Sequence, residues 1–264
     1  MLIVPVEHGF DKNRLPWITF FLIALNILIY VFYQTHDTEK MKKAVDTYLD
    51  RGLYQKEYAL FEAFQKEYSK QESAEGKASD NPLQQLYEMF FTRQLISARI
   101  LQDFEFEASL HLLSEYREDK RWQRFRGEVE EIRNSVSIYR FGFIPARFTV
   151  KGLIGSIFMH GSPDHLLGNM AILFLFGFLL EAVMGRWVYL SLYLLSGIMA
   201  NLFWMWASVS WFPGVGASGA IAGLMGMSLA AYGFRKIRFC FWFGPFVGYF
   251  KLMSILVFPI WVLW

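Results

Sequence analysis

Residues 187–234 read WVYLSLYLLSGIMANLFWMWASVSWFPGVGASGAIAGLMGMSLAAYGF and contain no Lys, Arg, Asp or Glu. This stretch holds 234 − 187 + 1 = 48 residues, whereas one membrane-spanning helix needs roughly 20. It therefore predicts two spans joined by a short link. Across the 264 residues, 54% are hydrophobic and 19% aromatic, which is too apolar for an ordinary soluble domain. The sequence predicts an integral membrane protein.

Other hydrophobic runs raise the expected number of spans to five. We expect these spans at about residues 17–33, 163–184, 187–209, 216–234 and 239–263. The last run is the least regular, because Pro245 and Pro259 remove backbone donors and would kink a helix. The predicted fold class is all-α, a polytopic bundle of transmembrane helices.

The formal net charge of +2 is unevenly distributed along the chain. Residues 34–148 hold 18 Lys and Arg against 20 Asp and Glu, a net of 18 − 20 = −2. Their abundance of Glu, Lys, Leu, Ala and Gln predicts a mostly helical insertion with a loop at 71–82. We therefore expect three parts: 1–33 with the first span, the insertion at 34–148, and a core of spans two to five at 149–264.

The basic residues next to the spans predict the orientation of the chain. With the N-terminus in the cytoplasm, Lys12, Arg14, Arg186 and the basic residues of 235–238 all lie inside, and the uncharged loop 210–215 lies outside. This arrangement agrees with the positive-inside rule and makes the insertion extracytoplasmic. No organellar presequence is visible, so a bacterial plasma (inner) membrane is expected. Nothing in this charge pattern suggests a nucleic-acid partner.

The fourth expected span begins with Gly216-Ala-Ser218-Gly219. Glycines on both sides of a serine allow a tight turn and leave the hydroxyl reachable. A helix N-terminus also offers free N–H groups that can bind a developing oxyanion. The alternative is structural, because small residues such as Gly219 and Gly223 also occur where membrane helices pack closely.

The second expected span begins within His160-Gly-Ser-Pro-Asp-His165-Leu-Leu-Gly-Asn169. The Ser-Pro pair at 162–163 is typical of a helix start, and His165 and Asn169 then lie one turn apart on the same face. Polar side chains in a membrane helix usually mark function. Spans two and four should begin on the same side of the membrane, so we expect Ser218 to lie at the depth of His165 and Asn169.

Two other interpretations of this segment stay open. Asn169 could simply bond a neighbouring helix while the histidines lie at the wet interface. A metal could be held by His160, Asp164 and His165, although their spacing matches no established ligand motif.

Taken together, the His160-x4-His165-x3-Asn169 pattern and the Ser218 motif resemble the rhomboid intramembrane serine proteases. The resemblance extends to Asn26 after Pro16, to Phe-Gly-Phe-Ile-Pro at 141–145 and to Glu181-x3-Gly185. It covers about residues 12–33 and 138–264 but not the insertion.

The resemblance implies a serine endopeptidase that cleaves transmembrane segments of other proteins within the lipid bilayer, without a cofactor. Ser218 would be the nucleophile. His165 and Asn169, with the Ser218 backbone N–H, would stabilise the oxyanion, and His160 would support that polar site. Glu181 would help to fix the turn between spans two and three.

One part of the family pattern has no counterpart in this sequence. In the family, a histidine on a sixth span activates the serine, whereas no histidine follows His165 in this chain. We expect the chain to be truncated before such a span. The alternative is a catalytically inactive rhomboid-like protein that binds membrane-protein clients. A transporter is disfavoured because spans three and four hold no ionisable residue that could line a pathway.

Overall fold

The computed structural model describes residues 2–5, 15–72, 93–233, 235–243 and 246–253. The chain divides into two compact units. The membrane unit comprises Met1–Thr35 and Arg140–Trp264, and the insertion unit comprises His36–Tyr139. Most of the loop expected at 71–82 lies outside the described residues. The expected division of the chain into residues 1–33, 34–148 and 149–264 stays a prediction.

Four helices of the membrane unit correspond to the first four expected spans. They are α1 (Trp17–Leu28, extended by the π-helix η2, Ile29–Tyr33), α11 (Pro163–Met184), α12 (Arg186–Ala207) and α13 (Ser218–Tyr232). Among the described residues, three helical stretches are long and apolar enough to cross a membrane: Trp17–Asp50, Pro163–Met184 and Arg186–Ala207. Helix α13 is apolar but shorter. The all-α class is confirmed, and the protein is a multi-pass membrane protein.

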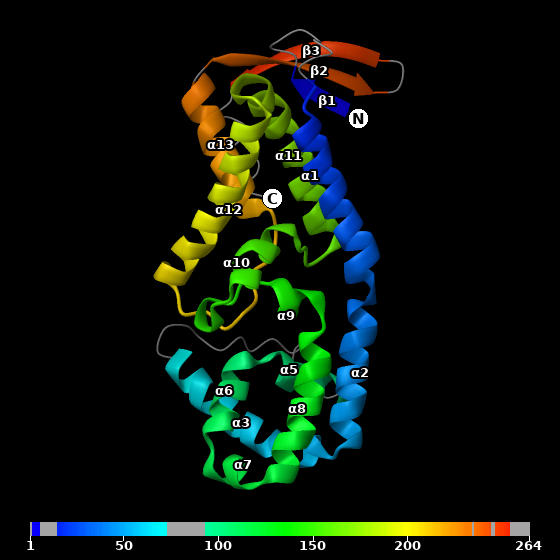
Figure 1. Ribbon diagram of the computed structural model, residues 1–264, viewed down its shortest axis with the longest axis vertical. Coiled ribbons are helices and arrows are strands. Elements are labelled where there is room, and N and C mark those ends of the chain that lie inside the picture. Colours follow the sequence, from blue (N-terminus) through cyan, green and yellow to red (C-terminus); the bar gives the residue numbers. More distant parts are fainter. Residues whose placement is uncertain (1, 6–14, 73–92, 234, 244–245, 254–264) are drawn as a thin grey trace. The chain divides into compact units, whose positions relative to one another are not determined.

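Helix α11 is central in the membrane unit, where it packs against α1, α12 and α13 (Figure 1). Helix α12 packs along α13, and small residues allow this close approach. A Cβ at Gly219 would meet the Ala200 Cβ at 2.6 Å, and one at Gly223 would meet the Ser196 Oγ at 2.2 Å. The structural interpretation of these two glycines is therefore correct, independently of any role for Ser218.

The carboxylate of Glu181 joins α11 to the start of α1. It is buried and accepts hydrogen bonds from the backbone N–H groups of Ile18 (2.9 Å) and Thr19 (2.8 Å) and from the Thr19 hydroxyl (2.9 Å). The first N–H groups of a helix have no partners within the helix, and they favour a negative charge. We expected this side chain to fix the turn into span three; its hydrogen bonds are instead to α1.

Replacing Glu181 with alanine should destabilise the membrane unit. The change leaves the buried N–H groups of Ile18 and Thr19 without acceptors, which typically costs roughly 1–3 kcal/mol. Thermal unfolding in detergent should show a lower Tm for Glu181→Ala, and a smaller loss for Glu181→Gln, which keeps an acceptor. Glu131→Ala, at an exposed position of the insertion unit, is the control. An equal Tm for Glu181→Ala and the control would contradict the capping role.

The prediction of a fifth span at residues 239–263 is wrong for the residues that the structure describes. Residues 236–253 form strands β2 (Lys236–Phe243) and β3 (Phe246–Met253), and β2 also pairs antiparallel with β1 (Leu2–Pro5). The segment is rich in aromatic and β-branched residues, which favour strands. Phe243 pairs with Phe246, so the link between the strands is the two residues Gly244-Pro245. Residues 254–263 of the expected span lie outside the described residues.

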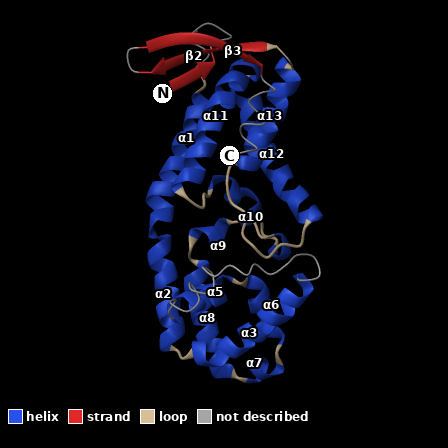
Figure 2. Cartoon of the chain, turned by 180° about the vertical axis from the view of Figure 1, so that it is seen from behind, coloured by secondary structure: helices blue, strands red, loops and turns tan. Residues whose placement is uncertain are grey.

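The insertion unit is helical wherever the structure describes it, as expected (Figure 2). Its helices are α2 (Asp37–Asp50), α3 (Leu53–Glu72), α5 (Arg93–Gln102), α6 (Phe104–Leu112), α7 (Ser114–Glu118), α8 (Lys120–Asn134) and the start of α9 (Ser137–Phe141). The unit has an apolar core of its own, which includes the fully buried residues Ala44, Tyr48, Ile100, Leu101, Leu110 and Val129.

This core also contains a buried network of charged groups. The fully buried carboxylate of Glu57 accepts hydrogen bonds from the Tyr48 hydroxyl (3.2 Å), the Trp122 indole (2.8 Å) and the Arg126 guanidinium (2.7 Å). Arg126 also donates to Glu130 (2.9 Å). A buried charge with several partners of this kind links three helices into one arrangement.

The network reaches the surface at His111, whose Nε2 lies 3.1 Å from Glu130. The hydrogen bond with Glu130 raises the pKa of the His111 imidazole above its usual value. A raised pKa in the folded state means that the pair contributes stability below the ordinary histidine pKa of about 6.5. That contribution is lost as the pH rises through the folded-state pKa.

Hydrogen exchange on the full chain should detect this loss. The amides of α6 and α8 should exchange faster, relative to intrinsic rates, as the pH rises from about 6 to about 8.5. His111→Gln cannot titrate, so the pH dependence of protection in these two helices should be smaller in this variant. An identical pH profile in the variant and the parent would exclude the contribution of His111.

Candidate functional site

Ser218 is the first residue of α13, and it follows a turn that only glycine adopts readily. Gly216 has φ = +126°, a backbone conformation that side chains disfavour. Its N–H donates to the Ser156 carbonyl at 2.8 Å. The N-cap residue of α13, Ala217, provides no side-chain cap, so the first N–H groups of this helix are left without a side-chain acceptor.

The Gly216 turn lies directly against His165 and Asn169. A Cβ at Gly216 would be 2.8 Å from the Cε1 and Nε2 atoms of His165 and 3.5 Å from the Asn169 Nδ2. The start of α11 and the start of α13 therefore meet, although 218 − 165 = 53 positions separate His165 from Ser218. Ser162 caps α11 by accepting from the His165 N–H at 3.1 Å, which confirms the expected helix start.

Asn169 and His160 carry buried polar atoms without hydrogen-bond partners. Asn169 is 4% exposed and His160 is 1% exposed; among the described residues, the Asn169 Nδ2 has no acceptor and neither ring nitrogen of His160 has a partner. The rings of His160 and His165 are 5.3 Å apart, edge to face. Unsatisfied buried polar groups are costly, so their clustering beside the Gly216 turn marks this region as a site for a polar ligand or reacting group.

Gln34, which the sequence analysis did not select, fixes the backbone of His160. The His160 N–H donates to the Gln34 Oε1 (3.0 Å), and the Gln34 Nε2 donates to the His160 carbonyl (2.8 Å). Gln34 directly follows the first apolar run and is buried. A buried amide at the end of a span was a signal that could have identified it.

Asn201 plays a similar part on the opposite side of the Gly216 turn. Its Nδ2 donates to the Leu153 carbonyl (2.9 Å) and to the Ser156 Oγ (2.8 Å), and Ser156 in turn accepts from Gly216. A cavity of about 180 Å³ lies here; among the residues that line it are Ser156, Asn201, Trp204, Gly216 and Ser218. Asn201 is a polar residue within the long uncharged stretch, so the sequence offered a signal that could have identified it.

The described residues do not supply a base for Ser218. No hydrogen bond joins its hydroxyl to any of them, and it is only partly buried. Within the same residues, no group of three His, Cys, Asp or Glu side chains is arranged to hold a metal ion. The site thus contains a reachable hydroxyl beside an amide, an imidazole and uncapped backbone N–H groups. These are the donors that acyl transfer requires around its oxyanion.

Gly216→Ala should destabilise the protein and disturb this site. The new methyl group would meet the His165 ring, and the residue would keep a φ that costs of order 1–3 kcal/mol for a side chain. Gly226→Ala, within α13, is the control, because nothing lies within 4 Å of its Cβ position; it should be neutral or stabilising by up to about 1 kcal/mol. Tm values in detergent give the comparison, and equal values for the two variants would contradict the close approach.

Comparisons with known proteins were made for the whole chain. Residues 147–264 match the family model described as the Rhomboid domain. Rhomboid-like protein 11, chloroplastic, of Arabidopsis thaliana is 32% identical over 126 residues, which cover 44% of this chain and 42% of that protein. "Putative rhomboid protease YdcA" of Bacillus subtilis (strain 168) is 39% identical over 84 residues, 32% of this chain and 42% of that protein. The matches therefore span about two fifths of each relative. No solved structure matches.

Proposed function

Because this chain belongs to the rhomboid family, and rhomboid proteins are intramembrane proteases or inactive relatives of them, we propose that it is an intramembrane serine endopeptidase. Its substrates are transmembrane segments of other membrane proteins. The observation that carries the proposal is the contact of the Gly216 turn with His165 and Asn169. This contact, two residues before Ser218, supports a role for His165 and Asn169 as hydrogen-bond donors to the reacting group.

In the proposed reaction, the Ser218 Oγ attacks the scissile carbonyl and forms a tetrahedral intermediate. The Asn169 amide, the His165 imidazole and the backbone N–H of Ser218 bind the oxygen that gains negative charge. His160, held by Gln34, keeps the His165 ring in position through its edge-to-face contact. Serine needs a base to accept its proton, and we propose a histidine provided from outside residues 1–264.

The proposed orientation follows from charge. Lys12, Arg14 and Arg186 flank spans and are assigned to the cytoplasm, which places the start of α13 and the insertion unit on the outer side. Cleavage would then occur near the outer face, in a bacterial plasma membrane. Substrates would enter laterally from the lipid, and residues that loosen a substrate helix should favour cleavage because a scissile bond must leave its helix.

The nucleophile can be tested on the product of the full reading frame, reconstituted in nanodiscs. A fluorophosphonate probe should label the protein, and cleavage of a membrane-spanning test substrate should be measurable. Ser218→Ala should abolish both signals. Asn169→Ala should lower kcat about 10²–10³-fold, as expected for loss of one oxyanion donor. Ser191→Ala, at an exposed position on α12, is the control and should leave both signals unchanged.

Two outcomes would argue against the proposed protease. Unchanged cleavage by Ser218→Ala would exclude Ser218 as the nucleophile. Absence of labelling and cleavage in the parent protein, together with binding of the same substrate, would favour the alternative of an inactive rhomboid-like protein that binds membrane-protein clients. The observation that favours this alternative is that no described base forms a hydrogen bond with Ser218.

A further inference from the structure

The insertion unit contains a groove between α3 and α6 that the proposed reaction does not use. Its volume is about 470 Å³. The α3 wall consists of Leu60, Ala63, Phe64 and Glu67, and the α6 wall consists of Glu105, Phe106, Ser109, Leu110 and the following Leu113. The groove is comparable in size to sites that take large side chains.

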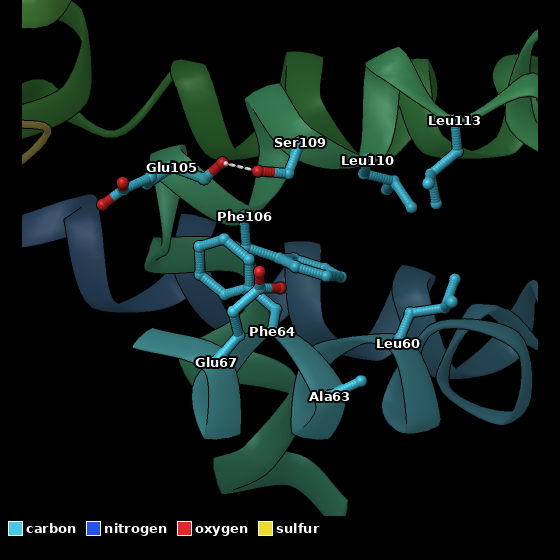
Figure 3. A pocket seen from close by; sticks show the side chains of 9 residues that line it. All are labelled: Leu60, Ala63, Phe64, Glu67, Glu105, Phe106, Ser109, Leu110 and Leu113. Atoms are coloured by element: carbon cyan, nitrogen blue, oxygen red, sulfur yellow. Dashed lines mark hydrogen bonds between the residues drawn. The ribbon is translucent and has the colours of Figure 1, made fainter. Parts of the chain in front are cut away.

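The spacing of the lining residues shows that each helix offers one continuous face. On α3 they recur at i, i+3, i+4 and i+7, and on α6 they follow the same helical period. Figure 3 shows the two faces opposite each other, with Leu60 across from Leu113 and Phe64 across from Phe106. The rings of Phe64 and Phe106 meet edge to face at 5.6 Å and form the floor. An apolar groove between two helix faces is a common binding site for a third helix.

Apolar surface remains accessible along this groove. Leu113 is 38% exposed, and its neighbour Leu112 is 68% exposed. Leu60 and Phe64 are half-buried, whereas Leu110 beneath them is fully buried. An added apolar helix face would therefore bury leucine and phenylalanine side chains that the described part of the insertion covers only partly.

The charge at one end of the groove restricts its occupant. Glu67 and Glu105 lie toward the same end, opposite the Leu60 and Leu113 end (Figure 3). Among the described residues that line the groove, these two are carboxylates and none is basic. A complementary helix would carry Lys or Arg next to its apolar face, at the end that meets the two carboxylates. An anionic lipid surface would be repelled by the same groups.

The apolar stretch in the chain's own link between α3 and α5 does not have this chemistry. Residues 83–91 read LQQLYEMFF, which provides apolar residues with one acid and no base. Its charge is of the same sign as that of the groove end. Charge complementarity therefore favours a helix from another protein.

We propose that the α3–α6 groove binds a basic amphipathic helix of a partner protein. The apolar face of that helix contacts Leu60, Phe64, Leu110 and Leu113, and its cationic side chains pair with Glu67 and Glu105. The proposal concerns the insertion unit alone. It does not depend on cleavage or on Ser218.

The test uses the full chain in nanodiscs of zwitterionic phosphatidylcholine and a fluorescent Leu/Lys peptide of about 18 residues, five helical turns. Fluorescence anisotropy should report saturable binding that empty nanodiscs do not give. A Leu/Glu peptide of the same spacing, and a Leu/Lys peptide scrambled to remove its apolar face, should bind much more weakly. The Glu67→Gln/Glu105→Gln double variant should raise the Kd roughly tenfold, since two partly exposed ion pairs are lost.

A second variant tests the shape of the groove separately from its charge. Ala63→Trp fills the groove from the α3 wall and should abolish binding while the Tm stays within the range of the parent. Glu131→Gln, an exposed carboxylate of α8 outside the groove, should bind as the parent does.

Three results would overturn the proposal. The first is equal binding of the Leu/Lys and Leu/Glu peptides. The second is binding that neither groove variant changes, or that empty nanodiscs reproduce, which would assign the peptide to the lipid. The third is binding that begins only after the apolar residues of 83–91 are replaced by serine, which would assign the groove to the chain itself.

Discussion

The contact between the backbone of Gly216 and the imidazole of His165 determines the geometry of the membrane unit around Ser218. It is possible only because position 216 has no side chain and adopts a positive φ. The Ser156 carbonyl holds this backbone from the other side, and Asn201 holds Ser156. The turn is thus fixed between two polar groups, so the serine that follows it starts its helix at a defined place.

The two units use buried polar groups in different ways. In the insertion unit, Glu57 has three donors, and Arg126 is paired with Glu57 and Glu130; the Arg126 Nη2 has no partner among the described residues, but the other groups of this network do. Beside Ser218, the ring nitrogens of His160 and the Nδ2 of Asn169 have no partners. A protein tolerates such groups where their hydrogen bonds are completed during function. The contrast separates a stabilising network from a candidate site.

Much of this arrangement could be predicted from local sequence. The four helices with strong hydrophobic runs, α13 included, were located to within a few residues, and the Ser162 cap followed from the Ser-Pro pair. The approach of the start of α13, at Gly216, to His165 and Asn169 on α11 was predicted from the direction of successive spans.

The features that were missed depend on partners far away in the chain or on ambiguous composition. Gln34 was not selected, and Glu181 was selected but with other partners; both bond to residues more than 120 positions away, and no local pattern identifies such partners. Residues 236–253 are hydrophobic enough for either a span or strands, and their aromatic and β-branched content decided between the two.

The Glu181 carboxylate has a consequence for biosynthesis. Its partners at Ile18 and Thr19 are made more than 160 residues earlier, so the ribosome completes the whole insertion between the two halves of the interaction. The N–H groups of Ile18 and Thr19 on α1 therefore lack their Glu181 acceptor until α11 has been synthesised. Docking of α1 onto α11 can therefore take place only after the whole segment between them has been translated.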